Sequence, residues 1–370
     1  MLNTLEFVVL LLSASVLMVA LFRSMNRPPE LGYRLVGAIG GPHALNLMQE
    51  SAGASHLAEF GVVFLMFSIG LEFSLARLMA MKRIVFGLGL VQVLASIALV
   101  TVLGRLFGLG WIAAFALGGT LAMSSTAILS KLLADRMELD SRHGREVIGV
   151  LLFQDIAVVP LLILLPALSR PAEELLFTLG LATLKAVLLL LLVLVFGQRL
   201  MRWWFTLVAK RRSTELFMLN VLLITLGLAW LSERVGLSLA IGAFLAGMLI
   251  SETEYRYQVE EDIKPFRDVL LGLFFVTVGM LLDVMEILRN LPAVLGMLAA
   301  LLVLKFGIVF AASRLFGSPP GTAMRSGLWL CAGGEFGFVL LSQILDLRLM
   351  PHGLAPVAVA ALVLSLLLAR

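Results

Sequence analysis

Three charged side chains interrupt long apolar stretches of the sequence. Asp155 follows Gln154 inside the run Val-Leu-Leu-Phe-Gln-Asp-Ile-Ala-Val-Val-Pro at residues 150–160, and Lys305 and Glu335 lie in two later stretches. Ionised groups inside long apolar helices are costly, and they often mark ion or proton pathways. A carboxylate in such a place binds either a proton or a desolvated alkali cation, so Asp155 alone is sufficient to exchange one for the other.

Oxygen-bearing neighbours could complete a cation site at Asp155. The Gln154 amide supplies a neutral carbonyl oxygen, which suits hard cations such as K+ or Na+. The cluster Ser124-Ser125-Thr126 adds hydroxyl groups from a separate apolar stretch. Lys305 could form a fixed ion pair with Asp155 that only holds helices together, or pair with Glu335, which we favour. Glu335 could instead cap the N-terminus of a half-helix.

The composition is that of an integral membrane protein in a lipid bilayer. Apolar residues make up 61% of the chain and charged residues only 14%, whereas soluble proteins carry roughly 25% charged residues. The net charge of +4 fits basic cytoplasmic loops and does not indicate binding to nucleic acid. A single cysteine, Cys331, excludes an internal disulfide framework and a thiolate metal cluster. We expect no cofactor.

We expect 13 transmembrane helices, because roughly 20 apolar residues are needed to cross ~30 Å of hydrocarbon. Half of that thickness corresponds to about ten helical residues. Asp155, Lys305 and Glu335 each lie about ten to thirteen residues into their spans, so they should share one depth beside the Ser124–Thr126 cluster. The predicted spans are 4–22, 31–47, 57–75, 84–104, 111–130, 146–168, 175–198, 215–232, 236–251, 266–284, 292–313, 323–344 and 352–369.

Basic residues alternate between the gaps that separate these spans. Of the 28 Lys and Arg residues, 21 fall in one set of alternate gaps or at the span ends beside them, 5 in the other set, and 2, Lys185 and Lys305, in the interior of spans. The positive-inside rule assigns the richer set to the cytoplasm. The N-terminus is therefore expected outside and the C-terminus inside.

A shift of 209 residues relates two parts of the chain. It aligns Phe67–Leu71 with Val276–Met280, and Ser124-Ser125-Thr126 with Gly333-Gly334-Glu335. The shift moves each span by seven crossings, an odd number, which predicts inverted repeats over approximately 31–200 and 236–370. Transporters of this construction bind ions where discontinuous helices meet near the midplane. The non-apolar clusters therefore predict breaks in the spans 111–130 and 323–344.

At these residues the chain resembles the Kef-type potassium/proton antiporters of the cation:proton antiporter-2 superfamily, over nearly its whole length. The resemblance is carried by Leu31-Gly32-Tyr33 with Gly41-Pro42, Ile69-Gly70-Leu71-Glu72, Ser124-Ser125-Thr126-Ala127-Ile128, Leu152-Phe153-Gln154-Asp155-Ile156-Ala157, Gly242-Ala243-Phe244-Leu245-Ala246-Gly247, Asp262-Ile263-Lys264-Pro265-Phe266, Leu270-Leu271-Gly272-Leu273-Phe274-Phe275 and Gly334-Glu335-Phe336. It implies an inverted-repeat fold in which the spans 111–130 and 323–344 cross. It further implies that Asp155 binds the cation and the proton. The pair Gln154-Asp155 is similar to the pair found in the potassium-associated branch of the family.

The resemblance also implies control of transport from the cytoplasm. The stretch Ser251–Phe266, which carries Glu260, Glu261 and Asp262, resembles the control loop of that family. A plain solvated loop is the alternative. The family further implies a homodimer in a bacterial cytoplasmic (inner) membrane, and a nucleotide-binding regulatory domain or subunit on the cytoplasmic side.

The sequence departs from the family pattern in three places. Residues 1–370 form a single predicted exchanger domain that ends at Arg370 directly after the last span, without a regulatory domain. Ala332 replaces a Gln three residues before Glu335, in the segment that forms the crossing. Arg34 replaces an apolar residue near the cytoplasmic end of the span 31–47, from which a long side chain can snorkel to the interface.

Other functions fit the residues less well. A gated K+ channel would need a pore lined by carbonyl groups or a charge ring, and no filter-like segment is present. An intramembrane aspartyl protease needs two midplane aspartates, and only Asp155 qualifies, so an enzyme is not expected. A Na+/proton antiporter and an ion-coupled symporter for organic acids on the same fold stay open as alternatives.

Overall fold

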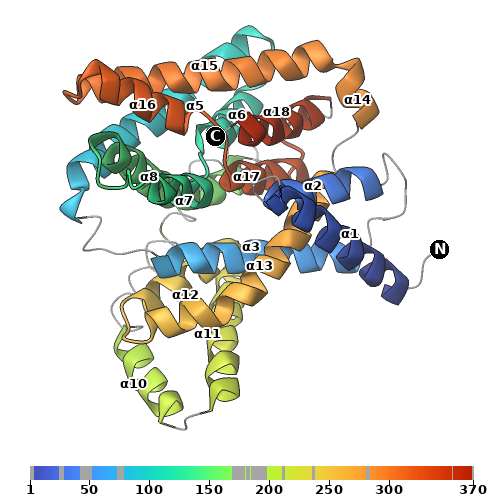
Figure 1. The fold of residues 1–370 in the computed structure, drawn as a ribbon, viewed down its shortest axis with the longest axis vertical. Helices are drawn as coiled ribbons and strands as arrows, with labels where there is room; N and C mark the ends of the chain where they lie inside the picture. Colours follow the sequence, from blue (N-terminus) through green and yellow to red (C-terminus); the bar gives the residue numbers. More distant parts are fainter. Residues whose placement is uncertain are drawn as a thin grey trace. The chain divides into compact units, whose positions relative to one another are not determined.

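A computed structural model describes residues 4–24, 29–41, 52–72, 79–168, 180, 184, 198–210, 213–235, 238–280, 284–351 and 353–368. Every regular element within these ranges is a helix (Figure 1). The predicted span 175–198 falls almost entirely outside them, as does Lys185. The described part of the chain is therefore all-helical, as the composition predicts.

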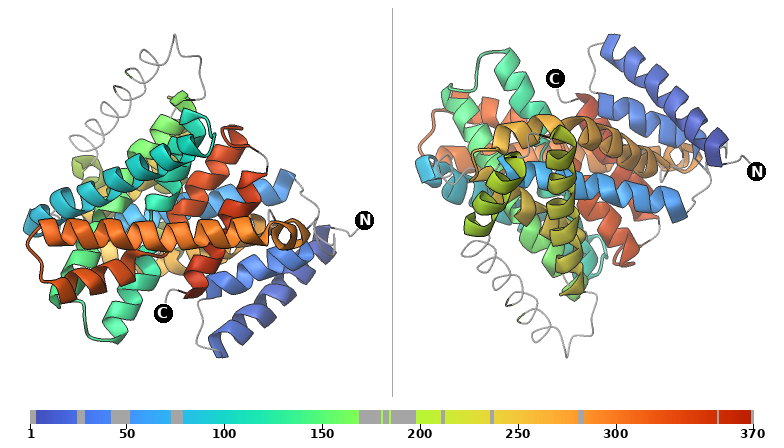
Figure 2. Two further views of the ribbon diagram at one scale, coloured as in Figure 1. Left: turned by 90° about the horizontal axis from the view of Figure 1, so that it is seen from above. Right: turned by 90° about the horizontal axis from the view of Figure 1, so that it is seen from below.

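One compact unit of the fold contains most of the polar residues singled out above. It comprises residues Met1–Gln49, Ala76–Leu161 and Val278–Arg370. Within it α15 packs along α16, α18 and α5, while α6 packs against α5 and α17; Figure 2 shows the long, straight α15 in orange from above. Its helices are α1 (Thr4–Ser24), α2 (Pro29–Gly40), the π-helix η1 (Ile84–Gly89), α5 (Leu90–Leu106), α6 (Trp111–Ala122), α7 (Thr126–Asp135), most of α8 (Arg142–Leu168), α14 (Val284–Arg289), α15 (Leu291–Leu315), α16 (Pro320–Leu330), α17 (Glu335–Asp346) and α18 (Leu354–Leu368).

The second unit comprises Glu50–Leu75 and Leu162–Thr277. It contains α3 (Ala52–Glu72), α10 (Gln198–Ala209), α11 (Thr214–Arg234), α12 (Leu239–Ser251) and most of α13 (Arg256–Met280). Every residue of α12 from Ala240 to Ile250 is buried. Gly247 lets α12 approach α3 closely, because a Cβ there would meet the backbone of α3 at Phe67. Small residues at such contacts are typical of helix packing in membranes.

Several helices are long and apolar enough to cross a bilayer. In the described residues these are Ile84–Leu106, which joins η1 to α5, Arg142–Leu168, Thr214–Arg234 and Leu291–Leu315. The pair α16 and α17 meets the same criterion as one span bent by 47°. Many apolar side chains on these helices are exposed, for example Leu94, Leu223 and Val303, as expected of surfaces that face lipid.

Both predicted helix breaks are present. The helix that begins at Trp111 stops at Ala122, and α7 begins at Thr126; the helix that begins at Pro320 stops at Leu330, and α17 begins at Glu335. The starting residues Trp111 and Pro320, and likewise Thr126 and Glu335, are 209 residues apart. The offset found in the sequence thus also relates the half-helices of the fold.

A pair of glycines follows the same offset. Gly70 of α3 lies against the backbone of α12 at Phe244, and Gly279 of α13 lies against the backbone of α2 at Arg34. In both places a Cβ would overlap backbone atoms, so only glycine allows the approach. The contact of α3 with α12 and the contact of α13 with α2 are therefore equivalent under the same shift.

Two expectations are wrong. The stretch 251–266 is largely helical, because α13 begins at Arg256 and continues through Pro265. Arg34 does not snorkel outward: it is 2% exposed, and its guanidinium carbon lies 4.1 Å from the centre of the Phe338 ring. The aromatic face of Phe338 gives this cation a favourable buried environment.

Candidate cation and proton site at two broken helices

Asp155 lies on α8 with only 7% of its surface exposed. Its Oδ1 accepts a hydrogen bond of 2.9 Å from Oγ1 of Thr126, the first residue of α7. Ser125 caps the same helix, because its Oγ accepts a 3.3 Å bond from the N–H of Ile128. The carboxylate thus lies beside the N-terminus of a half-helix, where the helix dipole favours negative charge.

Gln154 brackets the first break. Its Oε1 accepts a 2.7 Å bond from the backbone N–H of Ser124, and its Nε2 donates to Oε1 of Gln92 at 2.8 Å. Gln92 in turn donates to the carbonyl oxygen of Ala122 at 3.1 Å. Two side-chain amides therefore replace the hydrogen bonds that the backbone loses where α6 ends. The sequence predicted a carbonyl oxygen of Gln154 facing a cation, whereas in the structure this oxygen holds Ser124.

The two breaks touch each other. Oγ of Ser124 donates to the carbonyl oxygen of Leu330 at 3.0 Å. A Cβ on Gly334 would overlap the backbone of Ser124 and Ser125, so this glycine allows the extended segments to meet. On the far side of the second break, the N–H of Gly333 donates to Oγ of Ser365 at 3.0 Å.

Lys305 joins both breaks. The side chain is 2% exposed, and its Nζ donates to the carbonyl oxygens of Met123 at 2.5 Å and Ala332 at 2.9 Å. These carbonyls follow the C-terminal ends of α6 and α16, where the helix dipoles place partial negative charge. The predicted pairing of Lys305 with Glu335 is therefore not what the described residues show. The presence of Ala332 in place of the family's Gln does not affect this contact, because Lys305 contacts the backbone carbonyl of residue 332 and not its side chain.

Glu335 is the first residue of α17 and is half-buried. It places a carboxylate in the first turn of that half-helix, at the positive end of the helix dipole, while Gly334 occupies the N-cap position. The crossing thus has a cation at the C-terminal ends of its half-helices, and carboxylates, Asp155 and Glu335, near the N-terminal ends. Each charge opposes a dipole of the other sign.

A buried carboxylate that the sequence analysis missed is Glu146, on the same helix as Asp155. It is 5% exposed and accepts hydrogen bonds from Ser313 at 2.6 Å, from Ser326 at 2.7 Å and from Ser318. These oxygens are at hydrogen-bonding distance, so the serines tie α8 to the end of α15 and to α16. Gln92 was also missed, although a polar residue within the apolar span 84–104 was a signal.

The acidic residues expected to regulate transport lie on the first turns of α13. Glu260, Glu261 and Asp262 follow one another there, and Glu260 and Asp262 are half-buried. Burial, and then the neighbouring Glu261, raise the pKa of Asp262. One turn earlier, Arg256 donates to the carbonyl oxygen of Glu72 at 3.3 Å, which joins α13 to the end of α3.

In the described ranges no three His, Cys, Asp or Glu side chains gather as they would around a resident metal ion. Asp155 and Thr126 place two side-chain oxygens next to each other.

The sequence matches the family described as "Sodium/hydrogen exchanger, transmembrane" over residues 9–370. It is 42% identical over 368 residues to a putative K(+) efflux antiporter KefB of Alkalimonas amylolytica, covering 99% of this chain and 56% of the relative. It is 44% identical over 349 residues to the chloroplastic K(+) efflux antiporter 1 of Arabidopsis thaliana, covering 92% of this chain and 29% of the relative. The chain thus spans about half or less of the length of these relatives, and they support the predicted Kef-type resemblance.

The fold is similar to that of the sodium proton antiporter MjNhaP1 from Methanocaldococcus jannaschii. The TM-score is 0.70 at 15% sequence identity, with 98% of this chain and 94% of the other covered. At this identity the likeness concerns the fold alone. Together with the match over residues 9–370, it makes the chain a polytopic membrane protein that belongs to the sodium/hydrogen exchanger family.

Proposed function

We propose that this chain is the membrane domain of a monovalent cation/proton antiporter, with K+ as the favoured cation. The observation that supports this best is the surroundings of Asp155: a buried carboxylate beside Thr126, at a break that Gln154 holds open. The names of the Kef and chloroplast relatives describe K+ efflux antiporters. The Gln-Asp pair agrees with that preference.

The proposed mechanism is competition for one carboxylate. Protonated Asp155 has no charge with which to attract a cation, whereas ionised Asp155 can bind K+ with Oγ1 of Thr126 as a second oxygen ligand. Alternating access then carries the site across the membrane in one form and back in the other. Asp155 and Thr126 lie on different helices, α8 and α7, so movement of the half-helix α7 would change the ligand geometry.

We further propose that exchange is electroneutral, one cation for one proton. The proposal requires that Lys305, whose Nζ donates to backbone carbonyls of both breaks, keeps its proton throughout the cycle. The site then has the same net charge whether Asp155 carries a proton or a monovalent cation.

The membrane arrangement is proposed from the same sequence pattern. It has 13 spans, the N-terminus outside, the C-terminus inside, and inverted repeats over about 31–200 and 236–370 within one domain. The equal offset between the half-helices supports the repeats. We place the protein in a bacterial cytoplasmic membrane as a homodimer. We also propose that a cytoplasmic nucleotide-binding regulatory domain or subunit binds to α13 at Glu260, Glu261 and Asp262.

Proton flux in proteoliposomes tests this function. Flux should depend on K+ more steeply than on Na+ or Li+, each supplied in turn as chloride. The membrane potential is first clamped at zero with valinomycin and matched K+ on both sides, and a large potential is then imposed. The exchange equilibrium should be the same under both conditions. Flux without any counter-ion gradient would indicate a channel, and a preference for Na+ would assign the alternative cation. An equilibrium that follows the potential would exclude one-for-one exchange, since one charge across 100 mV is worth ~2.3 kcal/mol.

A further inference from the structure

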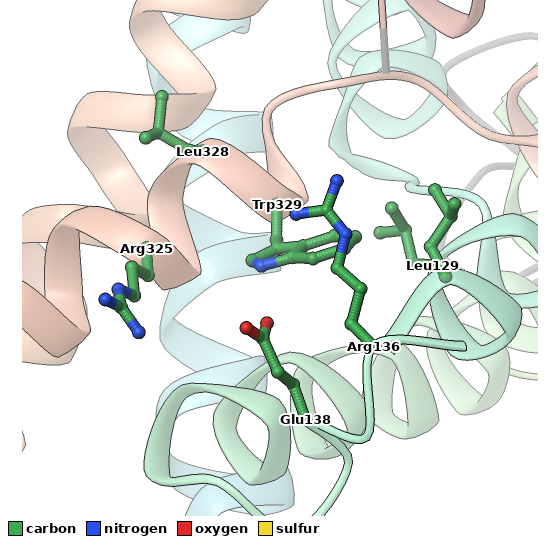
Figure 3. Close-up of a pocket in the computed structure, with 7 residues that line it drawn as sticks. Leu129, Arg136, Glu138, Arg325, Leu328 and Trp329 are labelled. Carbon is green, nitrogen blue, oxygen red and sulfur yellow. The ribbon is translucent and has the colours of Figure 1, made fainter. Parts of the chain in front are cut away.

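A cavity of about 360 Å³ lies at the C-terminal end of α7, next to α16. Its apolar side is formed by Leu129, Leu132, Leu328 and Trp329, and its polar side by Arg136, Glu138 and Arg325 (Figure 3). The site described above uses none of these residues. Because pockets of roughly 300–1,000 Å³ can hold small ligands, the cavity is large enough for one.

Its charges favour an anion. Arg136 and Arg325 are both exposed, and in the described part of the chain neither has a carboxylate partner. Glu138 is engaged elsewhere, because its Oε2 lies 3.0 Å from Nε2 of the buried His143. Two guanidinium groups and the single carboxylate of Glu138 line the cavity, which leaves an excess of positive charge.

The aromatic ring sets the geometry. The guanidinium carbon of Arg136 lies 5.3 Å from the centre of the Trp329 ring, and Figure 3 shows this arginine reaching across the indole from the α7 side. Arg325 lies four residues before Trp329 on α16, so both project from one face of that helix. A planar guanidinium held on an aromatic ring keeps its N–H groups at its edge, where they can bind two oxygens of one anion.

We propose that this cavity binds a phosphate group whose attached apolar part rests on Trp329 and Leu328. The phosphate can come from an anionic phospholipid headgroup of the surrounding leaflet or from a soluble phosphate compound. Arginine beside tryptophan is a usual combination at a membrane interface, and basic residues there attract anionic lipids.

A ligand in this cavity would contact both broken spans. Arg136 ends α7, whose first residue contacts Asp155, and Arg325 belongs to α16, whose last turn precedes the second break. One phosphate held by both arginines would brace a half-helix from each broken span. The ligand would thereby stabilise one arrangement of the crossing.

Binding can be tested without any transport assay, so its failure would be separate from failure of the antiporter. The protein is placed in nanodiscs of phosphatidylcholine, and its thermal unfolding midpoint is measured. Phosphatidylglycerol is added to the lipid in one arm, and inorganic phosphate to the buffer in the other, against sodium chloride of equal ionic strength. The variants are the double substitution Arg136→Gln with Arg325→Gln, the corresponding double Lys variant, and Arg105→Gln. Arg105 is a matched control, because it also stacks on a tryptophan, 5.0 Å from the ring centre of Trp111, but lines no part of this cavity.

We expect the midpoint to rise with phosphatidylglycerol, and the apparent affinity to fall about tenfold for each guanidinium removed. The double Lys variant should be intermediate, and Arg105→Gln should behave as wild type. A rise with inorganic phosphate as well would assign a soluble ligand. Equal midpoints under all conditions, an equal rise with sodium chloride, or an undiminished response in the double Gln variant would each overturn the proposal.

Discussion

Replacing Lys305 by methionine tests how the two breaks are held together. Methionine has a similar length and shape but no hydrogen-bond donor, so the carbonyl oxygens of Met123 and Ala332 would lose their shared partner. Both carbonyls follow the ends of half-helices, where no intrahelical donor replaces the lost one. The variant should therefore be less stable than wild type.

The size of the loss follows from the two contacts. A hydrogen bond to a charged group contributes roughly 1.5–3 kcal/mol, so two of them give a gross loss of ~3–6 kcal/mol. Methionine returns part of this, because a buried ammonium no longer has to be desolvated. We expect a net loss of at least ~2 kcal/mol, and about half of that for Lys305→Gln, whose amide can still donate to one carbonyl.

The assay is reversible unfolding in detergent, followed by intrinsic fluorescence for wild type, Lys305→Met and Lys305→Gln. Far-UV circular dichroism before denaturation verifies that each variant is folded. The order of stability should be wild type, glutamine variant, methionine variant. A methionine variant as stable as wild type would mean that Lys305 does not hold the two breaks together.

Three further substitutions probe other parts of the structure. Glu146→Ala should lower the free energy of unfolding by ~2–5 kcal/mol, because three buried serine hydroxyls lose their acceptor, and Glu146→Gln should cost less; denaturant titration measures both. Gly334→Ala should lower the free energy of unfolding by ~1–3 kcal/mol or more and slow exchange, since the added Cβ would overlap the backbone of Ser124. Gly307→Ala is the control and should do neither, because Gly307 has open space around it. Burial raises the pKa of Asp262, so the carboxyl group binds a proton more tightly in the folded state than in the unfolded state. The free energy of unfolding should therefore fall as the pH rises through the raised pKa. Asp262→Asn should show a smaller decrease with pH and be relatively more stable at neutral pH.

Local patterns in the sequence predicted several of the described helices and both breaks. Runs such as residues 146–168 and 292–313 are confirmed as α8 and α15, with ends shifted by a few residues. The clusters at Ser124 and Gly334 predicted both interruptions, because small and polar residues at one offset are unusual within apolar spans. The role of Asp155 came from its burial and from the family resemblance, and it stays a proposal.

The hydrogen-bond partners could not be predicted in the same way. Lys305 donates to backbone carbonyls and Gln154 to Gln92, and such choices depend on how segments far apart in sequence approach. Glu146 was missed, since nothing local indicates three serines around it. Pro265 was read as the end of a loop, although α13 continues through it at the cost of one backbone hydrogen bond.

One carboxylate, Asp155, is proposed to bind both the cation and the proton. The most direct test compares K+-dependent proton flux in proteoliposomes of wild type and Asp155→Asn, with Asp268→Asn as a control, because Asp268 is an exposed carboxylate paired with Arg267. We expect Asp155→Asn to be folded and inserted but to have no K+-dependent flux, while the control keeps wild-type flux. Undiminished flux in Asp155→Asn would show that Asp155 is not the shared binding group.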